Sequence, residues 1–322
     1  MAQSQFVSNC TIDALKTAAE ILKAGHLVAF PTETVYGLGA DANNESAVSK
    51  IYQVKGRPQD HPLIVHVADW QSMGEWAEEI PDFAIDLARA FWPGPMTLIL
   101  KRSELAKDFI TGGQNTVGIR VPNQTIALQL LTEFTKLGGK GVAAPSANRF
   151  GQVSPTTAQA VQEELSAFLN NEDSILDGGP CPVGIESTII DCTSANPRIL
   201  RPGAITIEDI NGVTGLEVDS VERSEIRVSG SLENHYAPDA QVLLDIEPQP
   251  GDGFIALADI PTPTGVIRLA APKTAEAFAY DLYAALRKGD AEGLKQIVVI
   301  QPKGDGIAIA IRDRLKRAAA GK

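Results

Sequence analysis

The stretch Phe30-Pro31-Thr32-Glu33-Thr34-Val35-Tyr36-Gly37-Leu38-Gly39-Ala40 is the segment around which we expect the chain to be organised. The mostly apolar residues 26–30 before it predict a short buried strand. Pro31 ends that strand, because proline has no N–H to donate to a neighbouring strand. Three hydroxyls and one carboxylate follow, and the two glycines permit a positive φ or a close approach of the backbone to a ligand. From these residues alone, a binding loop and a plain turn with locally satisfied threonines fit equally well.

Composition places the 322-residue chain among globular proteins, with 44% hydrophobic and 21% charged residues. Its net charge of −12 argues against broad, non-specific nucleic-acid binding. The scattered cysteines Cys10, Cys181 and Cys192 form no CxxC pair, so we expect neither a disulfide framework nor a zinc site. We also expect no signal peptide and no membrane span, because no run is long and apolar enough. A cytoplasmic protein fits best.

Hydrophobic spacing over the first two thirds of the chain alternates between helical and strand periods. It predicts helices over 11–23, 44–54, 81–91, 125–135 and 156–169. It predicts strands over 62–67, 96–100, 116–121, 141–144, 174–177, 187–191 and 198–200. Because the two kinds interleave without a strict βαβ rhythm, we expect a twisted mixed sheet with helices on its faces, in a first domain of residues 1–209.

The pattern weakens over residues 210–238, which are rich in glycine, serine and charge and indicate a linker. Beyond it, the spacing predicts strands over 241–246, 253–258, 265–269 and 296–300, and helices over 274–287 and 306–319. These strands are apolar, as parallel strands usually are. We therefore expect residues 239–322 to form a second, smaller α/β domain.

Basic and polar residues cluster after several of these elements. Lys55 and Arg57 follow the second helix, where cations commonly complement the helix dipole. Two of the four histidines, His61 and His66, come soon after and suggest anion handling, although no third ligand supports a metal site. Residues 144–148 follow a buried strand with small and polar side chains, which suit either an anion site or a local turn.

Two arginines stand next to apolar strand residues. Arg120 alternates with apolar neighbours, and Arg201 follows a short apolar run directly. An arginine in such a place either faces solvent or pairs with an anion. None of these features identifies a reaction by itself.

Seven motifs taken together resemble the YrdC/Sua5 family and stand in that family's order. They are FPTETVYGL (30–38), KGRP (55–58), PLIVH (62–66), WPGPMT (92–97), APSAN (144–148), GIEST (184–188) and LRPG (200–203). The resemblance covers roughly residues 10 to 210. The sequence HYAP at 235–238 extends it to the long Sua5 form, which implies a YrdC-like catalytic domain followed by a Rossmann-like Sua5 domain.

The resemblance implies an L-threonylcarbamoyladenylate synthase, a nucleotidyltransferase that joins L-threonine, bicarbonate and ATP and releases pyrophosphate. Its product would serve N6-threonylcarbamoylation of adenosine 37 in tRNA. Mg2+ is expected with ATP, without a metal site of the protein's own, because Mg2+ often binds substrate phosphates. The implied partners are a downstream tRNA threonylcarbamoyl transferase machinery and, at most, a weak contact with tRNA, with no membrane.

The family's site residues carry over to matching positions of this sequence. Arg120 is suited to the threonine carboxylate, because its guanidinium fork can bind both oxygens. The implied threonine site comprises Thr34, His66, Arg120, Ser187 and the backbone at Ala144. The implied ATP site comprises Arg57, His61, Thr116, Ser146, Ser154, Arg201 and Tyr236. The implied catalytic set, around phosphate and carbamate, comprises Lys55, Arg57, Ser146 and Asn148.

Two departures from the family pattern concern the nucleotide. His61 stands where many relatives have asparagine, and residues 229–234 lack the basic residues that often precede the His-Tyr pair. Two other functions remain to be weighed. A carbamoyl-adenylate transferase of the hydrogenase-maturation type would carry cysteine-rich zinc motifs and an acylphosphatase-like part, and this sequence has neither. A non-enzymatic RNA-binding module fits poorly with the acidic net charge.

Overall fold

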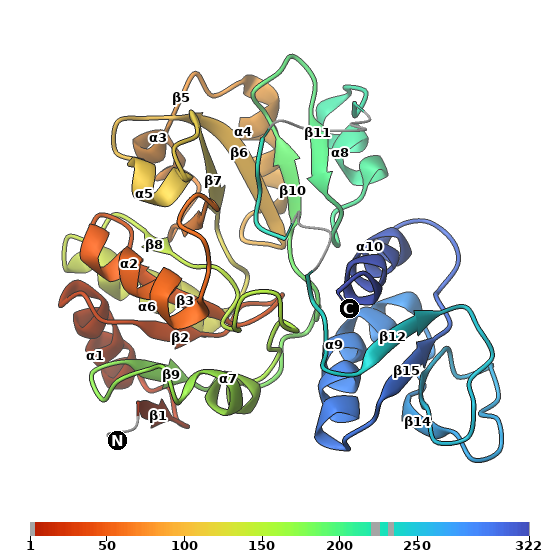
Figure 1. Ribbon diagram of the computed structural model, residues 1–322. Helices are drawn as coiled ribbons and strands as arrows, with labels where there is room; N and C mark the ends of the chain where they lie inside the picture. The colour runs from red at the N-terminus through yellow and green to blue at the C-terminus, as the bar shows by residue number, and fades with distance from the viewer. Residues whose placement is uncertain (1–3, 220–225, 231–234, 322) are drawn as a thin grey trace.

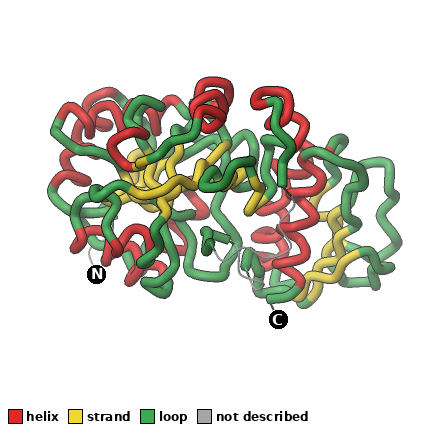
Figure 2. The backbone as a smooth tube through the Cα atoms, turned by 90° about the horizontal axis from the view of Figure 1, so that it is seen from above, coloured by secondary structure: helices red, strands yellow, loops and turns green. Residues whose placement is uncertain are grey.

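The computed structural model describes residues 4–219, 226–230 and 235–321 (Figure 1). Two β-sheets, each with its own helices, make up this part of the chain. Seen from above, the helices of the C-terminal unit stand between its small sheet and the larger N-terminal unit (Figure 2). The two units of the predicted architecture are therefore present, and the helices of the second one face the first.

The large sheet is mixed, as predicted. Its strand order is β1-β9-β2-β3-β8-β4-β7-β6-β10-β11, with β5 pairing beside β6. Pairs such as β4 with β7 are parallel, whereas β2 with β3 and β6 with β7 are antiparallel. The strands are β1 Gln5–Val7, β2 Val28–Phe30, β3 Gly37–Asp41, β4 Ile64–His66, β5 Ala77–Glu78, β6 Met96–Arg102, β7 Thr116–Arg120, β8 Val142–Ala143, β9 Ser174–Leu176, β10 Thr188–Asp191 and β11 Arg198–Arg201.

Helices cover both faces of this sheet. On one face α1 (Ile12–Lys23) and α6 (Thr125–Lys136) pack on each other and on β2 and β8 through one apolar cluster. The larger apolar cluster lies on the opposite face. It is covered by α2 (Glu45–Lys55), α3 (Met73–Trp76), α4 (Asp82–Phe91), α5 (Asp108–Thr111) and α7 (Ala158–Leu165).

The second helix begins and ends as its sequence indicates. The Asn44 side chain caps α2 by accepting from the Ala47 N–H, and Gly56 ends the helix with a φ of 62°. The expectation for Gly37 and Gly39 was incomplete, because both belong to a strand that the sequence pattern did not predict. A Cβ on Gly39 would lie 2.7 Å from Cγ1 of Val142, so this glycine permits close packing of the sheet.

The region predicted as a linker begins inside a helix. Helix α8 (Ile207–Thr214) starts with a capping box between Thr206 and Asp209, and it buries Ile210 in the core of the large unit, beside α4. The side chains that follow in 215–219 and 226–230 also lie along the large unit, where Val228 packs with Ile64, Ile99 and Ile189.

The C-terminal unit is a four-stranded, wholly parallel sheet in the order β12-β15-β13-β14. Its strands are β12 Gln241–Leu244, β13 Gly253–Ile255, β14 Ile267–Ala270 and β15 Gln296–Val299, and its helices are α9 Ala275–Ala291 and α10 Ile307–Ala319. Its apolar cluster also includes Val35, Val153 and Ile185 of the large unit, so the two units share buried surface. Throughout the described ranges, every helix is too short or too polar to cross a bilayer.

Candidate functional site

A pocket lies where the loop between β2 and β3 meets the ends of β4 and β7 and the turn after β8. Residues around position 187 and the described parts of 229–236 complete its walls. Most of its polar lining residues are buried. The lining consists of Thr32, Val35, Tyr36, Gly37, Arg57, Ile64, His66, Arg120, Ala144, Pro145, Ser146, Glu186, Ser187, Arg201, Ser229, Gly230, His235 and Tyr236.

The β2–β3 loop is held in shape by its own threonines. The Thr32 hydroxyl accepts from the N–H groups of Thr34 and Val35 and donates to the Val35 carbonyl at 2.7 Å. The Thr34 hydroxyl accepts from Nη2 of Arg120 at 2.9 Å. The same Nη2 lies 2.7 Å from Oε1 of Glu33, and both partners are only 5% exposed at their side chains. This loop therefore places a buried arginine at the pocket and neutralises part of its charge.

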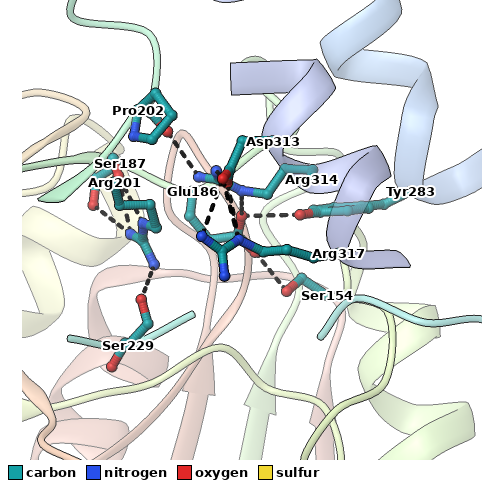
Figure 3. Close-up of polar contacts among 10 residues, drawn as sticks. All are labelled: Ser154, Glu186, Ser187, Arg201, Pro202, Ser229, Tyr283, Asp313, Arg314 and Arg317. Carbon is teal, nitrogen blue, oxygen red and sulfur yellow. Dashed lines mark hydrogen bonds and ion pairs between the residues drawn. The ribbon is translucent and has the colours of Figure 1, made fainter. Parts of the chain in front are cut away.

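Two further arginines reach the pocket and contact the segment that follows α8. Nη2 of Arg57 donates to the Pro62 carbonyl and to the Ser229 hydroxyl, at 3.1 and 3.3 Å. Nη1 of Arg201 donates to the Ser229 carbonyl at 2.7 Å, and its other nitrogens bond to Ser187 (Figure 3). Burial lowers the pKa of Arg57 to about 10, which leaves it charged at neutral pH.

Several buried polar atoms around the pocket have no hydrogen-bond partner among the residues that the structure describes. Such atoms are rare inside folded proteins and call for a ligand or water. Burial lowers the pKa of both histidines in this group, His66 and His235, to about 3, so both are neutral at pH 7. The atoms are Nε of Arg57, Nδ1 of His66, Nε of Arg120, Nδ1 of His235 and the hydroxyl of Tyr236.

Eight of the residues expected from the sequence line this pocket together. They are Arg57, His66, Arg120, Ala144, Ser146, Ser187, Arg201 and Tyr236. Thr34 lies just behind the wall, where it bonds to Thr32 and Arg120. The structure thus brings together residues of both the threonine set and the ATP set.

Lys55 and Asn148 lie behind the lining. Nζ of Lys55 donates to the carbonyls of Ser146 and Asn148, at 2.7 and 2.5 Å, and burial lowers its pKa well below the ordinary value. Nδ2 of Asn148 donates to the carbonyls of Arg149 and Gln152, each at 2.8 Å. In this arrangement the Lys55 ammonium and the Asn148 amide hold the turn after β8 in shape.

The remaining expected residues lie near the pocket but outside its lining. Ser154 donates to Oε1 of Glu186 at 2.6 Å. Thr116 lines a smaller neighbouring pocket that shares Ser229 with the first. His61 packs edge-on against the Phe150 ring, 5.3 Å between centroids.

Sequence reasoning missed two carboxylates at this site, Glu33 and Glu186, although both stand inside quoted motifs. The only sequence feature that could have indicated them is that each is a single acidic residue among apolar and hydroxyl residues of its motif. A buried carboxylate needs a cation or several donors. Those partners, Arg120 and Arg314, lie 87 and 128 positions away in the chain and cannot be chosen from local sequence.

Comparisons with known proteins cover nearly the whole chain. Residues 20–203 match the family model described as "Telomere recombination", and residues 205–320 match "Threonylcarbamoyl-AMP synthase, C-terminal domain". The chain is 38% identical to threonylcarbamoyl-AMP synthases of Pyrococcus abyssi and Bacillus subtilis, over 95% of its length and 94% and 92% of theirs. It superposes on the crystal structure of P. abyssi Sua5 complexed with L-threonine with a TM-score of 0.87 and 36% identity, covering 98% and 97% of the two chains.

Proposed function

Because the chain belongs to the Sua5/YrdC family, we propose that its central pocket joins L-threonine, bicarbonate and ATP into L-threonylcarbamoyl-AMP, with release of pyrophosphate. The enzyme is an adenylyl-transferring synthase, and its product serves N6-threonylcarbamoylation of tRNA. The observation that carries the assignment to this pocket is its set of buried, unpartnered polar atoms, among described residues, on two arginines and two histidines. Those atoms are suited to bind substrates with carboxylate and phosphate groups.

Threonine is proposed to bind beside Arg120. Arg120 lines the pocket and its Nε has no partner among the described residues, while Glu33 and Thr34 fix the orientation of the group. A carboxylate there would receive two charge-assisted hydrogen bonds. Neutral His66, Ser187 and the backbone at Ala144 complete this end of the pocket without adding a second charge.

ATP is proposed to bind toward Arg57, Ser146, Arg201 and Tyr236. In the first step the threonine amine forms a C–N bond to the carbon of bicarbonate, with loss of water, or of CO2, with loss of a proton, and the product is a carbamate. A carbamate oxygen then attacks the α-phosphorus, the bond to the β-phosphate bridging oxygen breaks, and pyrophosphate leaves. The two arginines neutralise the phosphate charge that develops, and the pocket holds both reactants in line. In this structure both arginines also bond to Ser229, through Nη2 of Arg57 and Nη1 of Arg201.

Mg2+ is proposed to arrive with the phosphates of ATP. Among the described residues there is no group of three or more His, Cys, Asp or Glu side chains that could hold a metal ion. Mg2+ usually binds through substrate phosphates and water. When bound, the ion supplies positive charge at the pyrophosphate.

The cellular setting is proposed to be the cytoplasm, where tRNA modification takes place. The free thiols of Cys181 and Cys192 are buried, and the described part of the chain contains no disulfide. The product is an activated acyl adenylate, so an acyl transferase acting on tRNA has to consume it. The acidic total charge suits handover of a small molecule better than extensive tRNA binding.

The test is pyrophosphate release by the full chain with ATP, Mg2+, bicarbonate and L-threonine, compared with reactions that lack threonine or bicarbonate. We expect release that depends on both, together with a nucleotide product that carries threonine. Pyrophosphate release that is absent, or indifferent to threonine, would overturn the proposal.

A further inference from the structure

Glu186 is a carboxylate buried where the two units meet (Figure 3). Its Oε1 accepts from the Ser154 hydroxyl at 2.6 Å. Its Oε2 accepts from the Tyr283 hydroxyl at 2.9 Å and from Nε of Arg314 at 2.8 Å. Ser154 belongs to the large unit, whereas Tyr283 and Arg314 stand on α9 and α10 of the C-terminal unit. One carboxylate therefore joins the C-terminal unit to a residue of the proposed ATP site.

The Arg314 side chain has no exposed surface, which is unusual for an arginine. Besides Glu186, it donates through Nη2 to the Pro202 carbonyl at 3.0 Å and through Nη1 to Oδ2 of Asp313 at 2.7 Å. Its guanidinium carbon also lies 5.4 Å from the centre of the Tyr236 ring. Figure 3 shows this guanidinium between the segment that carries Pro202 and the Glu186 carboxylate.

Glu186 and Pro202, two of the residues that Arg314 contacts, are each adjacent in sequence to a residue that lines the pocket. Glu186 precedes Ser187, and Pro202 follows Arg201. Ser187 and Arg201 in turn bond to each other through the Ser187 carbonyl and hydroxyl, at 3.0 and 3.1 Å. A shift of Arg314 would therefore move both of these pocket residues together.

The ionisation state of Glu186 is consistent with these contacts. Burial alone would raise the pKa of Glu186, but Arg314 and Arg201 lower it to about 2, so the carboxylate is ionised at neutral pH. An ionised carboxylate can accept from Ser154, Tyr283 and Arg314 together. A buried ion pair of this kind contributes little net stability, because the cost of desolvating both charges offsets much of their attraction.

We propose that Arg314, together with Tyr283, is a positioning residue for the ATP site that the C-terminal unit contributes to the large unit. It acts through Glu186 and Pro202 and holds Ser154 and Arg201 in the arrangement that receives the triphosphate, while Ser187, at the threonine end of the pocket, bonds to Arg201. The inference deepens the proposed function and rests on it. It also gives the C-terminal unit a role in the reaction beyond stabilising the chain.

The experiment compares Arg314→Lys, Tyr283→Phe and a control, Arg312→Met. Lysine keeps the charge but lacks the fork that reaches both Glu186 and Pro202. Phenylalanine removes only one hydroxyl. Arg312 lies on the same helix but donates to Pro302 within the C-terminal unit, so its loss leaves the pocket untouched. For each variant, one measures the thermal midpoint, the KM values for ATP and threonine, and calorimetric binding of α,β-methylene-ATP.

We expect Arg314→Lys to weaken binding of the ATP analogue and to raise the KM for ATP about tenfold. The reason is that a small displacement of binding groups can reduce the efficiency of a site by a large factor. Tyr283→Phe should act in the same direction by about threefold, since it loses one hydrogen bond to a charged group. In both variants the KM for threonine should rise less than the KM for ATP, because Ser187 is the only residue of the proposed threonine site that is coupled to this network. Both KM values of the control should stay within about twofold of the unchanged enzyme.

Unchanged analogue affinity in Tyr283→Phe and Arg314→Lys, with only a lower thermal midpoint, would overturn the inference and leave a purely structural contact. Equal losses for ATP and threonine would overturn it as well. Because analogue binding needs no turnover, this result is separate from the proposed function. A chain that binds the analogue tightly but makes no threonine-dependent pyrophosphate contradicts the function, whereas variants that bind it as tightly contradict only the positioning role.

Discussion

Arg120 is buried at the pocket with one of its nitrogens already committed. Nη2 serves both Glu33 and Thr34, whereas Nε has no partner among the described residues. A guanidinium carries five N–H donors, so this arrangement fixes the plane of the group and leaves donors for a substrate carboxylate. The Glu33 carboxylate also compensates the charge of the arginine before threonine binds, which avoids an isolated buried cation.

Replacing this arginine should therefore affect one substrate far more than the other. Arg120→Lys keeps a positive charge beside Glu33 but loses the planar fork. We expect the KM for threonine to rise by about tenfold or more, because a lost charge-assisted hydrogen bond is worth about 1.5–3 kcal/mol. Arg120→Ala should raise it further. The KM for ATP should change by less than about threefold in steady-state assays of Arg120→Lys, because the phosphate-facing arginines are untouched.

Arg198→Lys provides a matched control for this comparison. Arg198 pairs with Asp191 at the end of β10, outside the pocket lining, so both KM values should stay unchanged. Equal increases in the two KM values of Arg120→Lys would reject its role at the carboxylate.

Strand β3 shows how one element depends on its neighbours. It lies between β2 and β8, and all five of its residues are buried. A Cβ on Gly39 would lie 2.9 Å from Cε1 of Phe30, and it would also approach the side chain of Val142 and the carbonyl of Val28. Glycine is normally unfavourable inside a strand, but here the packing of adjacent strands requires it.

Gly39→Ala should consequently destabilise the fold by about 1–3 kcal/mol through overpacking. The measurement is urea unfolding followed by circular dichroism, with Gly74→Ala as the control. Gly74 stands in α3 with open space around its Cα and a φ that alanine can adopt, so alanine there should be neutral or slightly stabilising. Equal unfolding free energies for Gly39→Ala and the unchanged protein would contradict the packing of β3.

The whole molecule should respond to acid through its buried histidines. His66 and His235 have pKa values of about 3 when folded and near 6.5 in an unfolded chain. Above pH 6.5 both are neutral in either state. Below pH 6.5 these histidines become protonated in the unfolded chain, whereas in the folded chain they stay neutral down to about pH 3. Each histidine should therefore lower the free energy of unfolding by about 1.4 kcal/mol per pH unit as the pH falls through this window.

His66→Gln tests this expectation. Between pH 6 and 5 the free energy of unfolding of the variant should fall less steeply than that of the unchanged protein, by about 1 kcal/mol per pH unit. Urea unfolding at pH 5, 5.5 and 6 gives the two slopes. Between pH 7.5 and 8.5 the slopes should coincide, because the histidine is neutral in both states there. Parallel slopes in the acid range would mean that His66 is protonated in the folded protein.

Sequence periodicity alone was enough to predict most helices and strands, the mixed sheet and the parallel character of the second sheet. These properties are local, because they depend on which residues recur at spacings of two or about 3.6. The motif order was also sufficient to name the eight expected residues that the structure gathers in one pocket. Gly37–Asp41 escaped prediction, because its two glycines disfavour a strand when the neighbouring strands are unknown.

Only the tertiary structure decided where the charges are buried and what they meet. The stretch 30–40 turned out to hold both the loop that orients Arg120 and a glycine-containing strand that the neighbouring strands pack against. Lys55 donates hydrogen bonds to two backbone carbonyls, and Glu186 pairs with an arginine that lies 128 positions further along the chain. The partner of a buried charge is chosen by desolvation and by the geometry of distant segments. Neither the desolvation of a charge nor the position of distant segments can be predicted from the residues that are adjacent to it in sequence.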